Sequence, residues 1–133
     1  MQITPFSLAD IKAAHAKVKS GADFPSYIKD LVQLGVKSYI IFVRDGHAVY
    51  FGEDGYQLDS EPIYAELPIS LQSDKTVFIA QLRKHQQGKT DYFTFCQHCA
   101  ETGIEKWIVD TKEMTCIYYD LSAEEILMEI IPT

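Results

Sequence analysis

The spacing of apolar residues along the chain alternates between a helical period and a strand period. Apolar side chains three or four residues apart predict one helix from Ser7 to about Ser20 and a second from Asp23 to Leu34. β-Branched and aromatic residues then predict strands at 38–43 and 47–51, and a third strand within 62–69. The first half of the chain therefore has the order helix, helix and three strands.

Residues typical of helix ends support the first two helices. Ser7, with Asp10 three positions on, predicts an N-terminal capping box. Pro25 suits the first turn of the second helix, where its missing N–H breaks no hydrogen bond. Gly35 follows that helix at the position where a left-handed C-cap favours glycine.

The dipeptide Asp45-Gly46 separates the first two predicted strands. Asp-Gly between apolar runs is typical of a two-residue hairpin turn. Such a turn would place Val43 opposite Ala48 and Ile41 opposite Tyr50.

The second half of the chain repeats this order. Helical spacing predicts helices over about 73–87 and 91–102, a strand hairpin over 106–119 and a last strand over 125–131. When 103–120 is set under 35–52 without a gap, the offset is 68 residues (103 minus 35). Trp107 then falls on Tyr39, and Tyr118 falls on Tyr50.

This correspondence predicts an internal duplication with halves at about 7–69 and 73–131. The expected fold is a single α+β domain spanning 1–133, built from two helix-helix-β-meander units. It has a mainly antiparallel sheet of about six strands, with four helices packed on it and a pseudo-twofold axis between the halves. The order of strands between the halves is not predicted.

Composition excludes several classes of function. The 133 residues carry a formal net charge of −7, which disfavours binding to nucleic acid or to an anionic membrane surface. No apolar run approaches the roughly 20 residues of a membrane span, and the N-terminus has no signal-peptide pattern. Three cysteines cannot all pair with one another, so we expect reduced thiols in the cytoplasm.

Cys96-Gln97-His98-Cys99 resembles a metal or redox motif, but the repeat favours another interpretation. Cys96 and Cys99 fall on Ile28 and Leu31, which belong to the apolar stripe of the second helix. A free cysteine packs as a small buried apolar residue. We therefore expect core packing and neither a metal site nor a cofactor, and no local signature ties a histidine to a catalytic nucleophile.

Strand alternation places Tyr39, Tyr50, Trp107 and Tyr118 on one face of the predicted sheet. The opposite face is richer in aliphatic residues, so we expect the helices to cover that aliphatic face. Three interpretations of the aromatic face stay open: ordinary core, the interface of a homodimer, or a small-molecule pocket.

Asp110 departs from the repeat, because it falls on Phe42 in an otherwise apolar row. It is either a polar anchor for a ligand or an Asx-type cap on the turn at 111–113. His85 completes the set of candidate site residues, since a cleft between the halves could bring it near Trp107 and Asp110.

The segments 24–52 and 85–120 together resemble the YbcV-like family of bacterial proteins of unknown function (DUF1398). The second segment, HQQGKTDYFTFCQHCAETGIEKWIVDTKEMTCIYYD, carries most of the resemblance. Members are sometimes labelled phage envelope proteins, although this sequence has no span or signal to suit that label. The resemblance implies a small cytosolic α+β protein without an assigned reaction, cofactor or catalytic residue.

Two functions are predicted from these observations. The first is a non-enzymatic interaction protein, acting as a homodimer through the aromatic sheet face. The alternative is a small-molecule sensor or small enzyme with its site in the cleft between the two halves.

Overall fold

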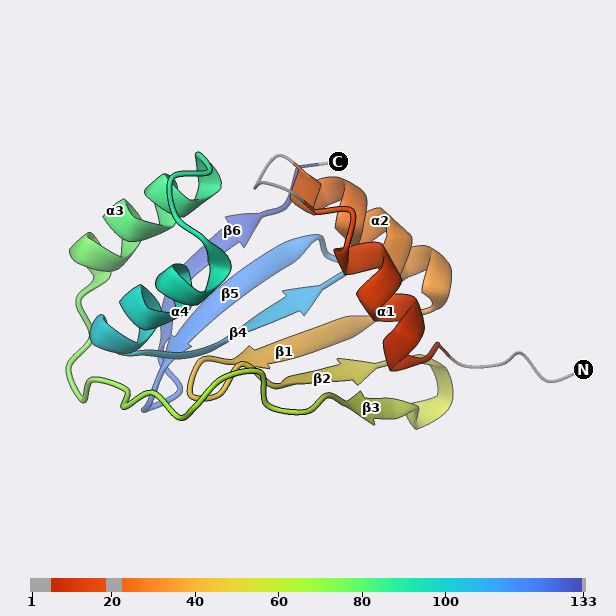
Figure 1. Cartoon of the computed structure of the whole chain (residues 1–133), viewed down its shortest axis with the longest axis horizontal. Coiled ribbons are helices and arrows are strands. Elements are labelled where there is room, and N and C mark those ends of the chain that lie inside the picture. Colours follow the sequence, from red (N-terminus) through yellow and green to blue (C-terminus); the bar gives the residue numbers. More distant parts are fainter. Residues whose placement is uncertain (1–5, 19–22, 133) are drawn as a thin grey trace, which may run out of the picture.

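The computed structural model describes residues 6–18 and 23–132, which form helices and one antiparallel sheet (Figure 1). The first half contains α1 (Leu8–His15), α2 (Phe24–Leu34), β1 (Ser38–Phe42), β2 (Ala48–Phe51), a 3-10 turn η2 (Glu53–Gly55) and β3 (Gln57–Asp59). The second half contains α3 (Lys75–Gln86), α4 (Tyr92–Glu101), β4 (Ile104–Asp110), β5 (Thr115–Asp120) and β6 (Glu125–Ile130). Within the described residues these are four α-helices and six strands, so the predicted α+β class and element order are confirmed.

The strand order is β3-β2-β1-β4-β5-β6, with β1 and β4 antiparallel at the centre. Ile40 pairs with Ile108, which is the residue 68 positions further along the chain. β1 and β4 hold corresponding places in the two halves, and corresponding residues face each other across the pair. This is the register that a local two-fold axis between the two strands requires. The sequence could not show this order, because nothing in either half specifies which strand edge meets the other half.

Backbone conformations also recur at the same offset. Positive φ angles occur at three pairs of positions 68 residues apart, namely Gly35 and Gly103, Gly46 and Met114, and Gly55 and Ala123. In two of these pairs one member is not glycine, although a side chain disfavours positive φ. The two halves therefore share turn geometry as well as element order, and their descent from one ancestral unit stays a prediction.

Local sequence signals set most helix boundaries. Ser7 and Asp10 form the predicted capping box at the start of α1. Gly35 ends α2 with φ 98°, as a left-handed C-cap requires. In the described residues α1 ends at His15, and the end predicted near Ser20 lies outside them.

The predicted third strand of the first half is wrong. β3 lies at Gln57–Asp59, and 62–69 is irregular. The N–H of Ile63 donates to Asp45 O at 2.9 Å and that of Leu67 donates to Arg44 O at 2.7 Å. The segment therefore crosses the β1–β2 turn instead of extending beside β2, and two prolines within it remove further donors.

The predicted register of the first hairpin is also wrong, by two residues. Ile41 faces Ala48 and Tyr39 faces Tyr50. The reason is tertiary, because the N–H of Val43 donates to Glu105 O in the neighbouring half at 2.9 Å and so leaves the hairpin. A shift of two residues keeps each side chain on its predicted face, since the strand period is two.

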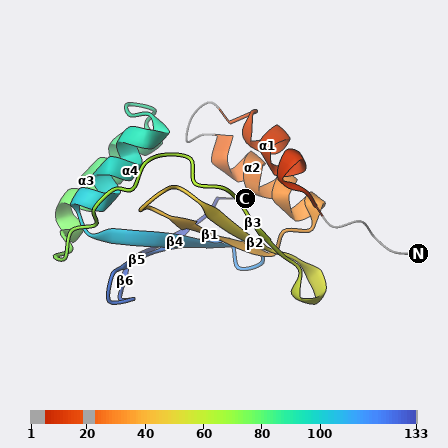
Figure 2. The same ribbon diagram turned by 60° about the horizontal axis from the view of Figure 1, so that its bottom comes forward.

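All the described helices lie on one side of the sheet (Figure 2). The core forms between that side of the sheet and the helices. Its largest fully buried side chains are Phe78, Ile28, Leu31, Leu82, Ile104, Val43, Val109, Cys96 and Cys99.

Candidate interaction surface

The helices cover the aromatic face of the sheet, so the predicted assignment of the two faces is wrong. Tyr39, Tyr50, Trp107 and Tyr118 are only 3% to 8% exposed. Their rings form two cross-strand pairs, with centroids 5.5 Å apart for Tyr39 and Tyr50 and 5.9 Å apart for Trp107 and Tyr118. In the folded chain this face is therefore not accessible to a partner protein.

Aromatic side chains from the helices explain why this face is the covered one. The Phe78 ring of α3 lies 4.9 Å from Tyr118, and the Phe95 ring of α4 lies 5.8 Å from Trp107. Burial raises the pKa of the Tyr39 and Tyr118 hydroxyls well above the usual value for tyrosine. These phenols stay neutral at physiological pH and belong to the core.

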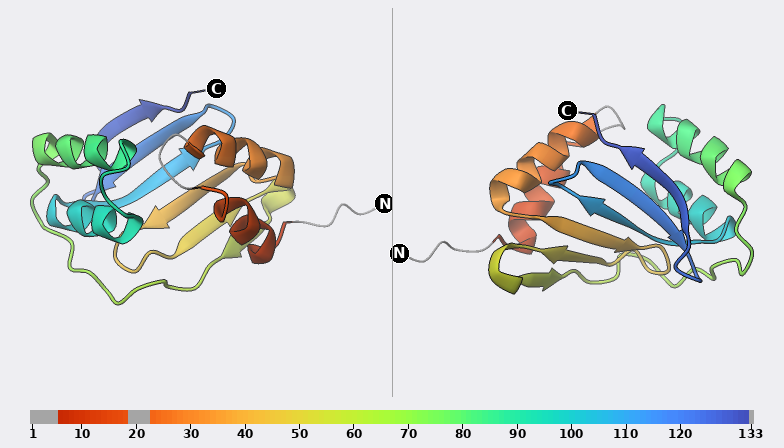
Figure 3. Two further views of the ribbon diagram at one scale, coloured as in Figure 1. Left: turned by 45° about the horizontal axis from the view of Figure 1, so that its top comes forward. Right: turned by 180° about the vertical axis from the view of Figure 1, so that it is seen from behind.

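The opposite face of the sheet is not covered by any helix of the described residues, as the rear view in Figure 3 shows. We call it the open sheet face, and strand register assigns its apolar residues. They are Ile40, Phe42, Val49, Phe51, Ile108, Ile117, Tyr119, Met128 and Ile130. Met128 and Ile130 are 48% and 67% exposed, and the other seven are partly buried among their neighbours.

The apolar residues of the open sheet face form a continuous row. Successive cross-strand pairs connect it through five strands, in the order Val49, Ile40, Ile108, Ile117 and Met128. A contiguous apolar surface that no helix covers marks an interaction site more often than isolated exposed residues do.

Charged residues flank this row on the central strand β4. Lys106 lies two residues before Ile108, and Asp110 lies two residues after it, on the same face. The Lys106 ammonium is 6.0 Å from the centre of the Tyr119 ring and 3.8 Å from a Glu105 carboxylate oxygen. Lys106 and Asp110 therefore place single charges of opposite sign on either side of Ile108.

Asp110 caps the β4–β5 turn. Its Oδ1 accepts hydrogen bonds from the backbone N–H groups of Lys112 and Glu113, both at 2.9 Å. Of the two interpretations left open by the sequence, the Asx-type cap is confirmed, and whether Asp110 also contacts a ligand stays a prediction.

His85 lies apart from Asp110. Its ring stacks on Phe95 at 4.4 Å, and its Nδ1 is 3.1 Å from both the carbonyl oxygen and the hydroxyl of Thr90. Burial lowers the pKa of His85, although the Thr90 carbonyl and Asp91 partly oppose this effect. The Phe95 ring lies between His85 and Trp107, with its centroid 4.4 Å from the first ring and 5.8 Å from the second. Asp110 ends β4 on the opposite face of the sheet.

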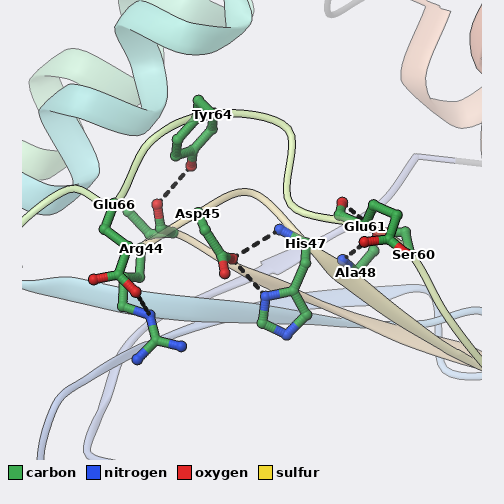
Figure 4. A network of polar contacts seen from close by, with 9 residues as sticks. Arg44, Asp45, His47, Ala48, Ser60, Glu61, Tyr64 and Glu66 are labelled. Carbon is green, nitrogen blue, oxygen red and sulfur yellow. Dashed lines mark hydrogen bonds and ion pairs between the residues drawn. The ribbon is translucent and has the colours of Figure 1, made fainter.

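A polar network at the β1–β2 turn was not found by sequence reasoning (Figure 4). Asp45 Oδ1 accepts from the backbone N–H of His47 at 3.0 Å and contacts the ring Nδ1 of the same residue. Burial would raise the pKa of Asp45, but the hydrogen bonds from His47 and the nearby Arg44 charge outweigh it and lower this pKa. The Asp-x-His spacing is the signal that could have predicted the contact of Asp45 with His47.

The same network ties the segment after β3 to the turn. Tyr64 donates its hydroxyl to Val43 O, and the Glu66 carboxylate lies 3.9 Å from the Arg44 guanidinium. Ser60 Oγ accepts from the N–H of Ala48 at 2.7 Å. These contacts hold the segment 60–66 in place, although it pairs with no strand of the sheet.

The three cysteines are free and buried, so the predicted core packing of Cys96 and Cys99 is confirmed. Burial raises the pKa of all three thiols, that of Cys116 to about 12. Among the described residues, no three histidine, cysteine or carboxylate side chains converge as a metal site would require.

Two hollows among the described residues lie beside α2. One of about 60 Å³ lies between α1 and α2, and one of about 250 Å³ lies between α2 and Met114 at the β4–β5 turn. Neither is lined by Asp110, Trp107 or His85, so the predicted cleft that joins these residues is not among them.

Comparison with known proteins places the chain in a family. Residues 12–130 match the family described as "Protein of unknown function (DUF1398)". The chain belongs to the DUF1398 family. This DUF1398 chain is also 28% identical over 102 residues to the uncharacterized proteins Mb2035 of Mycobacterium bovis and Rv2012 of Mycobacterium tuberculosis.

These alignments cover 74% of this chain and 60% of each mycobacterial protein. The DUF1398 chain thus spans about three fifths of the length of these relatives. Among its described residues, no helix has the length and apolarity needed to cross a bilayer.

Proposed function

We propose that this DUF1398 protein is a non-enzymatic interaction protein that acts as a homodimer, with the open sheet faces of two copies packed together. The continuous row from Val49 to Met128 carries the proposal, because it is the apolar surface that the chain's own helices leave uncovered. Two sheets that pack face to face bury such rows at a separation of about 10 Å. The cytoplasm is the compartment we propose, since the three thiols are free.

Charge complementarity favours a second copy as the occupant of this face. Consider a dimer axis that runs along the Ile40–Ile108 row, parallel to the sheet. Rotation about this axis places each Lys106 over Asp110 of the other copy, while Ile108 meets Ile108. Strands of the two sheets are then nearly aligned, which is a common arrangement of packed sheets.

The dimensions of the face predict a modest affinity. Four gaps of about 4.8 Å between the five strands of the row and about five residues of about 3.4 Å along each strand give a face of roughly 19 by 17 Å. This area of roughly 320 Å² is less than half of the about 800 Å² that each partner buries in a standard interface, and it is typical of a weak, transient contact. We therefore expect a dimer that dissociates on dilution.

The test is sedimentation equilibrium across a wide range of concentration. Ile117→Lys should shift the protein to monomer, because two lysine charges would be buried near the centre of the interface. Val77→Lys on α3 is the matched control, since Val77 is 43% exposed and lies on the helix side. It should leave the dimer unchanged.

Two results would overturn the proposal. One is a wild-type protein that stays monomeric at the highest soluble concentration, and the other is a dimer that Ile117→Lys does not weaken. Far-UV circular dichroism of each variant shows whether a loss of dimer reflects unfolding. Lys106→Glu provides a further test, because it places like charges opposite each other and should weaken the dimer most at low salt.

A ligand site between the two halves stays a prediction, and the two hollows beside α2 offer no support for the residues first assigned to it.

A further inference from the structure

The side chain of His47, at the β1–β2 turn, is held in one orientation. Its ring stacks on Phe42, with the two ring centroids 4.5 Å apart and the planes at 6° to each other. Its Nδ1 contacts Oδ1 of Asp45, and the same oxygen accepts from the His47 backbone N–H at 3.0 Å. Because Phe42 belongs to the open sheet face, the stacked His47 ring lies on that side of the sheet as well.

Asp45 is a buried carboxylate that stays ionised near neutral pH. Its side chain belongs to a residue that is only 8% exposed. Burial would raise the pKa of Asp45, but the hydrogen bonds from His47 bring this pKa below its ordinary value. A carboxylate beside Nδ1 selects the tautomer of the neutral ring that carries its proton on Nδ1. The lone pair of the His47 ring is therefore on Nε2.

The Nε2 atom of His47 is accessible to solvent. It has no hydrogen-bond partner among the described residues. Within that part of the chain, the only side-chain nitrogen or oxygen that is both buried and without a partner is Nδ1 of His98. Nε2 of His47 is thus not buried, and Figure 4 shows it pointing away from Asp45. The ring therefore presents one free nitrogen, in a fixed position.

The Arg44 guanidinium projects to the same side of the turn as the His47 ring, away from the helices (Figure 4). The Arg44 side chain is 59% exposed, and its Nε is 3.9 Å from a Glu66 carboxylate oxygen. Its two terminal nitrogens make no hydrogen bond among the described residues. Arginine binds phosphate through two such nitrogens, so this side chain is available to an anion beside His47.

His85 provides a comparison within the same chain. Its ring also stacks on an aromatic ring, that of Phe95, with the centroids 4.4 Å apart and the planes at 8° to each other. Its Nδ1 meets the carbonyl and hydroxyl oxygens of Thr90, which carry no charge. Arg83, two residues before it, is already paired with Glu129 at 2.6 Å. The two histidines therefore differ in the carboxylate at Nδ1 and in the unpaired guanidinium nearby.

We propose that His47 is a phosphoryl-acceptor site, at which Nε2 takes a phosphoryl group from a small donor of the phosphoramidate class. The Nε2 lone pair forms the new N–P bond, and the protonated amino group of the donor leaves as ammonia with the electron pair of the broken P–N bond. The proton on Nδ1 stays in place, and Asp45 balances the positive charge that develops on the ring. Arg44 binds the phosphoryl oxygens. The site does not depend on the proposed dimer.

The probe for the test is phosphoramidate itself. It is added at neutral pH to protein at a concentration at which the chain is monomeric. Phosphorus NMR and mass spectrometry of peptides give the rate of phosphorylation at each histidine. We expect His47 to be labelled on Nε2 at least about tenfold faster than His85, since a hydrogen bond to a charged group changes a barrier by that order. His47→Gln should lose the fast reaction and leave that of His85 unchanged.

Two variants separate the chemistry from the structure of the turn. Asp45→Asn keeps the size and the accepting oxygen without the charge, and it should slow labelling of His47 about tenfold or more. Arg44→Gln should slow it several-fold, most at low salt. It should not slow the reaction of His47 with diethyl pyrocarbonate, an uncharged reagent that attacks the same nitrogen. Lys112→Gln, 68 positions after Arg44, is the matched control and should change neither reaction.

Labelling of His47 no faster than that of His85 in the wild-type protein would overturn the proposal, and this comparison does not require any variant to fold. Far-UV circular dichroism shows whether Asp45→Asn is folded, and an unchanged rate in the folded variant would also overturn it. Equal slowing by Arg44→Gln with both reagents would have the same consequence, because Arg44 would then act on the shape of the turn and not on the phosphoryl group.

Discussion

Gly35 and Gly103 offer a controlled comparison, because they hold corresponding positions after α2 and α4. Their φ angles are 98° and 84°, so an alanine at either site meets a similar backbone penalty. Their surroundings differ. A Cβ on Gly35 would have no atom within 4 Å, whereas a Cβ on Gly103 would lie 2.8 Å from Ser73 Cα and 2.9 Å from Gln72 O.

The expected losses of stability follow from these contacts. A positive φ costs a non-glycine residue about 1–2 kcal/mol, and loss of glycine's freedom in the unfolded chain returns roughly 0.4–1 kcal/mol. Gly35→Ala should therefore lower the free energy of unfolding by about 1 kcal/mol. Gly103→Ala should cost a further ~2 kcal/mol, because its neighbours are backbone atoms that cannot rotate away.

Urea denaturation, followed by the fluorescence of the single tryptophan, Trp107, measures both losses. All proteins are compared at one concentration, since a dimer would make the midpoint depend on it. Gly88→Ala is a second control, because Gly88 has φ 77° and a Cβ at this position would have no atom within 4 Å. Equal losses at Gly35 and Gly103 would refute the reasoning, because close backbone packing would then have no measurable cost.

Two further predictions concern the core thiols and the Asp110 cap. Burial raises the pKa of Cys116 from 9.0 to about 12, so its contribution to stability is complete below about pH 9 and is lost as pH rises toward 12. The free energy of unfolding should fall more steeply between pH 9 and 10.5 in wild type than in Cys116→Ala, and parallel curves would contradict this. Asp110→Ala should lower the free energy of unfolding by about 1 kcal/mol, because two turn N–H groups lose their acceptor. Asp110→Asn, which keeps an accepting oxygen, should recover most of that loss in the same urea assay, and an equal loss in both variants would argue against a capping role.

The sequence by itself determined the helices, five of the six strands and much of the core. Apolar periodicity and cap residues located the helices, and the offset of 68 residues predicted that Cys96 and Cys99 pack as Ile28 and Leu31 do. These features are local, or are repeated locally, and so a linear pattern contains them. Strand alternation likewise showed which side chains share a face.

Only the tertiary structure decided which face of the sheet the helices cover. Both faces are apolar, and the alternation of side chains along a strand does not indicate what packs against each face. The choice depends on how rings such as Phe78 and Phe95 fit against Trp107 and Tyr118. The path of 62–69 could not be predicted from the sequence either. Its hydrogen bonds go to Arg44 and Asp45, about 20 residues earlier in the chain. The open sheet face exists because of these long-range contacts, which no local pattern encodes.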